Sequence, residues 1–194
     1  MNSKIQALKS KALEENIPIM MDDTINYIKK LIEMYKITDI LEIGTAVGFS
    51  AINFALVSKD VKLVSIERDQ NRFIEAVKNV KDFDLSNQIE LVLNDALNFD
   101  INKKFDLIII DAAKGKNIDF FEKYKENLKK GGLILTDNTL FHGLVGKSST
   151  IPARNLRSLV RKIENYIEFL KNNEEFTTVF LELGDGLAIS KKRD

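Results

Sequence analysis

The sequence predicts an α/β protein built on one open, mostly parallel sheet of seven strands that ends in an antiparallel hairpin. Two observations lead to this fold class. From residue 39 onward, short apolar runs alternate with amphipathic segments of helical period, which is typical of parallel strands joined by crossover helices. The last two β-rich runs are separated only by a short segment that contains glycine, which indicates a hairpin.

Two helices are expected before the first strand, over residues 3–15 and 23–36. We expect Asp22 or Asp23 to cap the second helix, because a carboxylate there can accept hydrogen bonds from free backbone N–H groups. The second helix also carries an apolar stripe that should face the core, made of Ile25, Ile28, Ile32 and Tyr35.

The expected strands have the sequences DILEIG, KLVSIE, IELVLN, FDLIIID, GLILTD, FTTVFLEL and GLAIS, in this order. Residues 107–110 are apolar on both faces, as in a strand that helices cover on both sides. Crossover helices are expected over residues 48–58, 70–82 and 117–130, and a longer helix over 153–173. The expected turn of the final hairpin is Gly184-Asp185-Gly186.

The composition excludes several kinds of functional site. The 194 residues suit one domain over residues 1–194, with helices of residues 1–36 packed on it. Without Cys, and with His142 as its single His, the chain can form no disulfide and no thiolate zinc site, and it fits a Ser-His-Asp triad poorly. No apolar run is long enough for a membrane span and the N-terminus lacks the apolar core of a signal peptide, so we expect a cytoplasmic protein.

The segment from Glu42 to Ser50, EIGTAVGFS, is a candidate loop for a nucleoside cofactor. Its glycines, Gly44 and Gly48, let the backbone turn sharply and approach a ligand at the start of a helix. Glu67 ends the second strand 19 residues after Gly48, the spacing at which an acidic side chain accepts hydrogen bonds from ribose hydroxyls. The third strand ends in Asn94-Asp95-Ala96, where an adenine would lie.

Two alternatives stay open for this loop. The glycines could serve only to close tight turns, and the spacing alone does not separate NAD from S-adenosylmethionine. The pattern here is G-x-x-x-G, which differs from the dinucleotide pattern G-x-G-x-x-G, so an NAD-binding or non-catalytic nucleotide-binding module is the less favoured hypothesis.

Oxygen-bearing side chains follow the fourth and fifth strands. Asp111 ends the fourth strand, with Lys114 three residues later, and Asp137-Asn138 ends the fifth. Neighbouring parallel strands bring their carboxyl ends to one edge of the sheet, so two carboxylates and one amide should converge there. Such an oxygen-only set suits Mg²⁺ or Ca²⁺ and leaves positions open for a substrate, and Lys114 beside it could act as a general base. The alternative is that these residues only form turns and helix caps.

The segment from Lys147 to Lys171 carries a net charge of +4, although the whole chain, with 29 basic and 29 acidic residues, is neutral. Arg154, Arg157 and Arg161 share one helix face at i, i+3 and i+7, where they could grip phosphates beside a flipped base. A solvated charged helix face is the alternative interpretation.

Together the segments LEIGTAVGFSAI, SIERD, NDA, IIIDAAKG and TDNTLFHGLV resemble the metal- and S-adenosylmethionine-dependent O-methyltransferases of the catechol and caffeoyl-CoA type. The segments TDNTLFHGLV, LVRKIENY and GDGLAISKK are most similar to the bacterial branch that methylates tRNA 5-hydroxyuridine. The resemblance implies a Rossmann-like class I methyltransferase fold and a homodimer. It also implies that Asp111, Asp137 and Asn138 hold the metal, with Lys114 and Asp111 as the catalytic residues.

The resemblance further implies a cofactor site for S-adenosylmethionine. Glu67 would hold the ribose and Ser50 the methionine carboxylate. The cofactor-binding residues expected from the loop and from the resemblance are Met20, Glu42, Gly44, Thr45, Gly48, Ser50, Glu67, Asp95, Ala96 and Asp111.

The expected reaction is methyl transfer to the 5-hydroxyl of 5-hydroxyuridine at the tRNA wobble position, giving 5-methoxyuridine, with the tRNA anticodon region as partner. The alternative acceptor is a small catechol-like or caffeoyl-CoA-like phenol. Both place two oxygens on adjacent carbons, and a divalent ion such as Mg²⁺ can bind both oxygens at once and stabilise the attacking oxyanion. The metal site therefore predicts a vicinal-oxygen acceptor, whether it is free or attached to tRNA.

Overall fold

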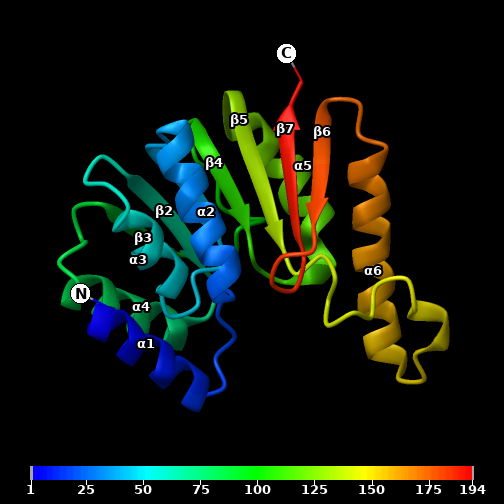
Figure 1. Ribbon diagram of the computed structural model, residues 1–194, viewed down its shortest axis with the longest axis horizontal. Coiled ribbons are helices and arrows are strands. Elements are labelled where there is room, and N and C mark those ends of the chain that lie inside the picture. Colours follow the sequence, from blue (N-terminus) through cyan, green and yellow to red (C-terminus); the bar gives the residue numbers. More distant parts are fainter. Residues whose placement is uncertain (1, 194) are drawn as a thin grey trace. The chain divides into compact units, whose positions relative to one another are not determined.

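The computed structural model describes residues 2–193, and the chain divides into two compact units, the first ending at Ile101 and the second beginning at Asn102 (Figure 1). Within the described residues there are seven strands, as the sequence predicts, and β6 and β7 form the predicted antiparallel hairpin. Strand β7 also pairs antiparallel with β5. No helix within this part of the chain is long and apolar enough to cross a membrane.

The first unit alternates helices with three parallel strands. Its elements are α1 (Asn2–Glu14), α2 (Asp22–Tyr35), β1 (Asp39–Ile43), α3 (Phe49–Ala55), β2 (Lys62–Glu67), α4 (Gln70–Asp82) and β3 (Ile89–Leu93). Strand β2 lies between β1 and β3, in a register that aligns Ile43 with Ile66 and Glu67 with Leu93. The carboxyl ends of the three strands therefore lie together, and each opens into one of the predicted cofactor segments.

The second unit contains four strands. Its elements are β4 (Phe105–Ile110), the short 3₁₀ helix η1 (Lys114–Lys116), α5 (Asn117–Tyr124), η2 (Lys125–Asn127), β5 (Leu128–Asp137), η3 (Ser148–Thr150), α6 (Arg154–Lys171), β6 (Phe176–Leu181) and β7 (Leu187–Lys192). The strand order in this unit is β4-β5-β7-β6, with β4 and β5 parallel. The residues from Leu107 to Ile110 are fully buried, which confirms that β4 is apolar on both faces.

An aromatic cluster fixes α6 in the second unit. Phe121 of α5 makes edge-to-face contacts with Phe169 of α6 and Phe176 of β6, at centroid distances of 5.5 and 4.9 Å. Tyr166 of α6 lies in the same cluster, and its buried hydroxyl forms a 2.7 Å hydrogen bond with Thr136 of β5. Burial raises the pKa of Tyr166 far above its usual value, so its hydroxyl stays protonated and keeps the hydrogen bond with Thr136. The ring contacts and this hydrogen bond hold α6 beside β6 (Figure 1).

Two expectations for the second helix are wrong. The N-cap of α2 is Met21, and Asp22 and Asp23 instead occupy the first helical turn, where negative charge still favours the positive end of the helix. Tyr35 is exposed, because α2 ends there and Lys36 adopts a left-handed conformation with φ 51°. Leu31 is buried, so the apolar face is shifted toward Leu31 at its C-terminal end.

The helix expected over residues 117–130 is also too long. It ends at Tyr124, and Leu128 already pairs with Phe105 as part of β5. The helical pattern of charges continues through Lys129 and Lys130 into β5, so the sequence predicts a helix that is longer than α5. At Gly132 an added Cβ would lie 2.9 Å from the carbonyl oxygen of Asp106, so the strand can approach β4 there only with glycine.

Candidate active site

The loop that follows β1 bends through three residues with positive φ. These are Gly44 at 102°, Ala46 at 47° and Gly48 at 82°. The backbone N–H of Gly48 donates to the carbonyl oxygen of Thr45 at 2.9 Å. From α4, the side chain of Asn79 donates to the carbonyl oxygen of Val47, also at 2.9 Å. The loop therefore has a fixed conformation within its own unit before any ligand binds.

Behind this loop lies a buried polar network centred on Glu42. The carboxylate accepts hydrogen bonds from the hydroxyls of Ser50 and Ser65 and is fully buried. Because the proton of Ser65 goes to Glu42, the hydroxyl of Thr45, 2.6 Å from that of Ser65, must donate to it. Sequence reasoning missed Ser65, since nothing in the β2 pattern distinguishes it from any other strand residue.

This network assigns Glu42 a supporting position, because its two carboxylate oxygens each receive a hydroxyl. It also constrains the role expected for Ser50, whose hydroxyl proton is already donated to Glu42. Direct donation from Ser50 to the methionine carboxylate would require that hydrogen bond to break. The expected contact of Ser50 with the cofactor stays a prediction.

Glu67, at the end of β2, is nearly buried and is held by backbone donors. Oε2 accepts from the N–H of Ala46 at 2.8 Å, and Oε1 accepts from the N–H groups of Arg68 and Asp69 at 2.9 and 2.8 Å. These contacts tie Glu67 to the β1 loop and fix its carboxylate at the strand end. Oε2 accepts only one of these bonds, so it can accept a further hydrogen bond, which a ribose hydroxyl could donate.

The segment after β3 lies beside Glu67. The N–H of Asn94 donates to the carbonyl oxygen of Glu67, and Asp95 forms an Asx turn in which Oδ1 accepts from the N–H of Leu97 at 2.9 Å. Ala96 is buried in the first unit, and so is Met20, which precedes α2. The contacts of these residues with a cofactor stay a prediction.

In the second unit the register of β4 and β5 brings the two predicted carboxylates next to each other. Ile110 pairs with Thr136, so Asp111 and Asp137 are the next residues on adjacent parallel strands. Lys114, in η1, donates through Nζ to Oδ1 of Asp111 at 2.6 Å, and both side chains are largely buried. The structure therefore brings Asp111, Lys114 and Asp137 together as the sequence predicts.

The local electrostatics around Asp137 suit a divalent cation. Asp137 is buried, and its Oδ1 has no hydrogen-bond partner. Burial and the negative charge of Asp111 raise the pKa of Asp137 to about 7, although Lys114 and the backbone N–H of Asn138 act in the opposite direction. A buried carboxylate oxygen without a donor is costly, and a hard divalent cation would neutralise it. Within the described residues no three His, Cys, Asp or Glu side chains form a group that could hold a metal ion. A cation site at Asp111 and Asp137 would therefore need a ligand of another kind, such as the amide oxygen of Asn138.

Asn138 adopts a left-handed conformation with φ 62°, and its Nδ2 lies 3.4 Å from Oδ2 of Asp185. Asp185 belongs to the β6–β7 turn, and its charge also contributes to the raised pKa of Asp137. The sequence assigned Asp185 only to a hairpin turn. Its position near Asn138, 47 residues away in the chain, becomes visible only in the fold.

His142, whose role the sequence left open, is an exposed loop residue in the structure. Its ring lies 5.3 Å from that of Phe141, and its Nδ1 lies 3.4 Å from Oδ2 of Asp185. This placement fits the loop interpretation, on the segment that directly follows Asn138.

The three arginines of the predicted basic face all lie on α6, but they are not equivalent. Arg154 and Arg161 are exposed, whereas Arg157 is partly buried and donates to the carbonyl oxygen of Ile151 at 3.2 Å. Glu164 on the same helix accepts hydrogen bonds from Ser148 and Gly146, which lowers its pKa and keeps a negative charge among the arginines.

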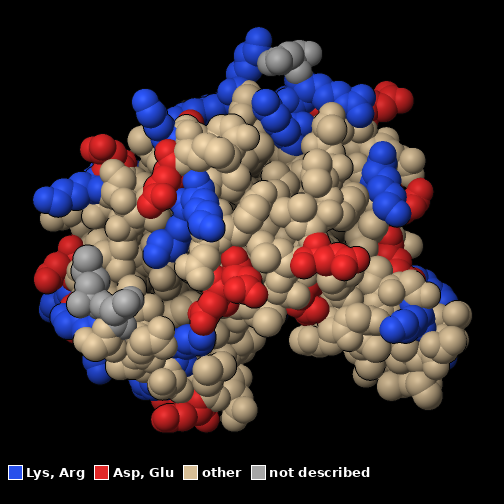
Figure 2. All heavy atoms as spheres, viewed as in Figure 1, with Lys and Arg blue, Asp and Glu red and all other residues tan. Residues whose placement is uncertain are grey.

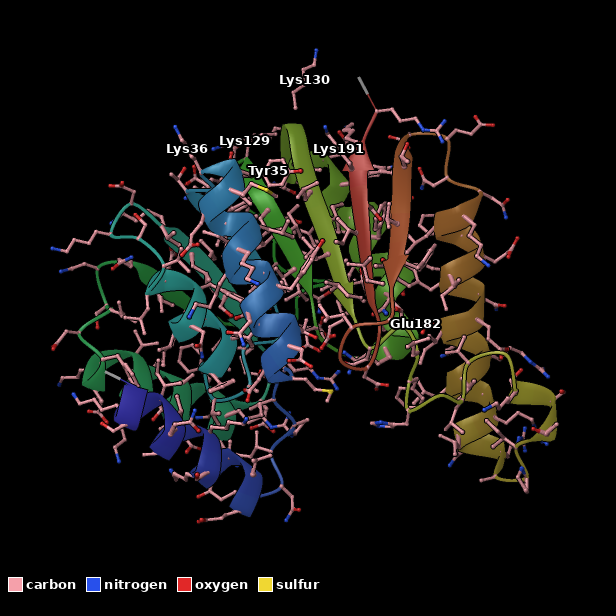
Figure 3. All side chains as sticks on the ribbon, in the orientation of Figure 1. Tyr35, Lys36, Lys129, Lys130, Glu182 and Lys191 are labelled. Atoms are coloured by element: carbon pink, nitrogen blue, oxygen red, sulfur yellow. The ribbon has the colours of Figure 1, made fainter. Side chains whose placement is uncertain are left out.

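The second unit also has a group of basic side chains that the sequence did not single out. Lys and Arg side chains gather at the end of β7 (Figure 2), and the labelled Lys129, Lys130 and Lys191 lie toward this end of β5 and β7 (Figure 3). Lys191 pairs with Leu133, at the middle of β5. Glu182 lies at the other end of the hairpin, where β4 and β5 end in Asp111 and Asp137 (Figure 3).

Comparison with known proteins identifies the relatives of this chain. The model of the O-methyltransferase family matches residues 2–193. A Staphylococcus aureus protein provisionally described as a caffeoyl-CoA O-methyltransferase has a crystal structure that is similar with a TM-score of 0.94 and 39% identity, covering 97% of this chain and 92% of that one.

Two further relatives extend the comparison. The O-methyltransferase from Bacillus cereus, solved in complex with S-adenosylhomocysteine, has a TM-score of 0.85 and 22% identity, covering 98% of this chain and 91% of its own. The caffeoyl-CoA O-methyltransferase of Populus kitakamiensis is 24% identical, over 86% of this chain and 74% of its own. The structural likeness confirms the class I methyltransferase α/β fold with its terminal antiparallel hairpin.

Proposed function

The chain belongs to the O-methyltransferase family and is an S-adenosylmethionine-dependent O-methyltransferase, and from this premise we propose that it methylates one of two adjacent oxygens on a small phenol of the catechol or caffeoyl-CoA kind. The observation that carries the proposal is the buried Oδ1 of Asp137, which has no donor and lies beside Asp111. A site that needs a hard cation favours an acceptor with two neighbouring oxygens, because such an acceptor can chelate the cation.

Asp111, Asp137 and Asn138 are the residues that would hold the divalent cation. Bound there, the cation would supply Lewis acidity that stabilises the oxyanion of the acceptor. Asp111 has a second role, because it holds Lys114 through a 2.6 Å contact. Lys114 Nζ, fixed in this way, can donate a hydrogen bond that orients the acceptor oxygen and stabilises its negative charge as it attacks the methyl group of the sulfonium, while the proton of the hydroxyl leaves to solvent.

The first unit would supply the cofactor contacts. S-adenosylhomocysteine in the Bacillus cereus relative and S-adenosylmethionine in the Streptomyces achromogenes protein TomG support the same cofactor for this chain. Glu67 would accept from the ribose hydroxyls, since backbone N–H groups already hold its carboxylate in place. The glycine-containing loop from Gly44 to Gly48, Asp95, Ala96 and Met20 would surround the remainder.

An acceptor panel tests the proposal. The purified protein would be assayed with S-adenosylmethionine and Mg²⁺ on catechol, caffeoyl-CoA, phenol and tRNA that carries 5-hydroxyuridine. We expect transfer to catechol or caffeoyl-CoA, little transfer to phenol, and loss of activity in excess EDTA. Equal rates on phenol and catechol, or full activity in EDTA, would contradict the vicinal-oxygen mechanism.

A second candidate acceptor is 5-hydroxyuridine at the tRNA wobble position, and the exposed Arg154 and Arg161 on one face of α6 favour it. These arginines would contact phosphates of the anticodon region, and a homodimer could present two such faces. Arg154→Ala and Arg161→Ala should then reduce turnover on tRNA while leaving catechol turnover unchanged. The nucleosides of tRNA from a deletion strain would provide an independent test, because unchanged 5-methoxyuridine there would exclude this acceptor unless a second enzyme makes it.

A further inference from the structure

We propose that Asp185 is a positioning residue for the metal ligand Asn138: its carboxylate holds the Asn138 amide with the carbonyl oxygen turned toward the cation site, and it fixes the loop that follows. The inference rests on the proposed function, because it concerns the cation site of that reaction. Asp185 itself touches neither substrate nor cofactor in this account.

The fold brings the β6–β7 turn against the segment after β5. Strands β5 and β7 pair up to Asp137 and Leu187, so the turn residues come next to Asn138 and its successors. The N–H of Thr139 donates to the carbonyl oxygen of Gly186 at 3.0 Å, and the N–H of Leu140 donates to that of Asp185 at 2.8 Å. The metal-ligand segment and the turn are therefore joined by two backbone hydrogen bonds.

Gly186 makes this close approach possible. An added Cβ at Gly186 would lie 2.5 Å from the backbone nitrogen of Leu140, a distance that no real Cβ contact tolerates. Its φ of 89° is also a conformation that favours glycine. The turn is thus built to press its backbone onto the loop, which places the side chain of Asp185 beside Asn138.

The carboxylate of Asp185 contacts both the ligand and the loop. Oδ2 lies 3.4 Å from Nδ2 of Asn138, and Oδ1 accepts a hydrogen bond from the backbone N–H of His142 at 2.5 Å. A carboxylate can only accept, so it selects the NH₂ side of the Asn138 amide. The carbonyl oxygen of that amide, the only atom of the group that can bind a cation, is then turned away from Asp185.

The loop needs such an anchor because its backbone is unusual. The backbone φ angle is positive at Asn138, Phe141 and His142, with values of 62°, 46° and 55°. Residues other than glycine rarely adopt this conformation. Asp185 holds the beginning of this loop through His142, and Glu164 holds its end through Ser148 and Gly146. Without Asp185 the strained segment that carries Asn138 would lose its anchor at the end nearer to the ligand.

The test is Mn²⁺ binding, measured by isothermal titration calorimetry on the whole protein without substrate. Asp185→Asn keeps the size of the side chain and can still accept from His142, but it presents one NH₂ group to another at Asn138. We expect it to weaken Mn²⁺ affinity by about tenfold, the usual scale for residues that orient a metal ligand. The matched control is Asp119→Asn, which removes one exposed carboxylate, bonded to Lys116, from the same unit.

A paired exchange separates orientation from charge. Adding Asn138→Asp to Asp185→Asn exchanges donor and acceptor while the total charge of the pair stays the same. The new amide can then donate to the new carboxylate, which keeps one oxygen for the cation, so we expect Mn²⁺ affinity to return to within about threefold of wild type. Asp185→Asn, the double variant and the Asp119→Asn control should all keep the affinity for S-adenosylhomocysteine.

Three results would overturn the inference. These are unchanged Mn²⁺ affinity in a folded Asp185→Asn variant, failure of the paired exchange to restore the affinity, and an equal loss in the Asp119→Asn control. Absence of Mn²⁺ binding by the wild-type protein is a different result, because it would refute the metal in the proposed function and the role of Asp185 with it. If Asp185→Asn does not fold, the paired exchange alone decides, since normal Mn²⁺ affinity in it supports the inference and weak affinity contradicts it.

Discussion

The buried carboxylates of the two units differ in how their charge is balanced. In the first unit, Glu42 receives two hydroxyl donors and Glu67 receives three backbone N–H groups. In the second unit, Asp137 is about as buried, yet its Oδ1 has no donor and its pKa is raised to about 7. The first unit satisfies these carboxylates with its own donors, whereas in the second unit a buried carboxylate oxygen is left without one.

This difference teaches what each unit is suited to bind. Hydroxyl and backbone N–H groups of the chain already donate hydrogen bonds to the carboxylates of Glu42 and Glu67. A ligand of the first unit therefore only has to offer hydroxyl groups to Glu67 and needs no charge of its own there. The strand ends of the second unit hold Asp111 and Asp137 side by side with Asp137 buried, where its negative charge is costly unless a proton or a cation neutralises it. From this difference we propose that the first unit recognises the ribose of the cofactor and that the second binds the cation.

The largest expected effect is that of Asp137→Ala. It removes the oxygen that most needs the cation, so turnover on catechol should fall by at least about 1000-fold, since a Lewis acid supplies several kcal/mol. Affinity for S-adenosylhomocysteine, measured by calorimetry, should stay within about tenfold, or about 1.4 kcal/mol. Asp119→Ala is the control, and an Asp137→Ala variant that keeps metal-stimulated turnover would remove the contrast between the units.

The next effect concerns the first unit. Glu67→Gln should weaken binding of S-adenosylmethionine by roughly 10- to 100-fold, because an amide is a poorer acceptor for ribose hydroxyls and no longer suits the three backbone donors. Calorimetric titration with the cofactor measures this change, with the exposed Glu90→Gln on β3 as control. Mn²⁺ affinity should not change. Cofactor binding equal to that of the control would remove Glu67 from the ribose site.

Lys114→Ala should have a smaller effect that falls on the chemical step. We expect kcat to decrease by about 10- to 100-fold with KM changed by less than about threefold, as for a group that acts in the transition state. Lys116→Ala, which alters an exposed lysine two residues away, should change neither constant. A higher KM with unchanged kcat would reassign Lys114 to substrate binding.

Much of the fold could be predicted because the hydrophobic period is regular. The bounds of β2 and α4 match the expected ranges of residues 62–67 and 70–82. The end of α5 could not be predicted, because Lys129 and Lys130 continue a helical charge pattern into a segment whose backbone pairs with β4. The sequence pattern predicts where α5 begins. It does not predict where α5 ends, because Leu128 already pairs with Phe105 of β4.

The candidate site divides in the same way. Asp111 and Asp137 could be predicted to lie side by side because parallel strands deliver their ends to one edge, and the register confirms this. The hydrogen bonds of Ser65 to Glu42 and of Asn138 to Asp185 join residues that are 23 and 47 positions apart. No local pattern carries such pairs, so the supporting residues of both units became visible only in the structure.

The smallest expected effect is a change of stability with pH. The pKa of Asp137 is raised from 3.8 to about 7 in the folded protein, so between these values the folded state keeps a proton that the unfolded state releases. This stabilising contribution is present at low pH and is lost as the pH rises through about 7. In EDTA, Tm should therefore fall between pH 6 and pH 8.5, by roughly 2–4 °C for each kcal/mol lost.

Two controls accompany this pH measurement. Asp137→Asn should remove this part of the pH dependence, because the amide does not titrate. Mg²⁺ should raise Tm of the wild-type protein more at pH 8.5 than at pH 6, since the cation competes with the proton for the carboxylate. A Tm that rises between pH 6 and pH 8.5 in EDTA for the wild type relative to Asp137→Asn would show that the carboxylate is paired in some other way.

The central claim is that the second unit binds a divalent cation at the ends of β4 and β5. Crystals of the wild-type protein soaked in Mn²⁺ would test it by anomalous scattering. We expect one strong peak in contact with carboxylate oxygens of Asp111 and Asp137 and the amide oxygen of Asn138. No peak there at saturating Mn²⁺, with Oδ1 of Asp137 bonded to a water or another donor instead, would contradict it.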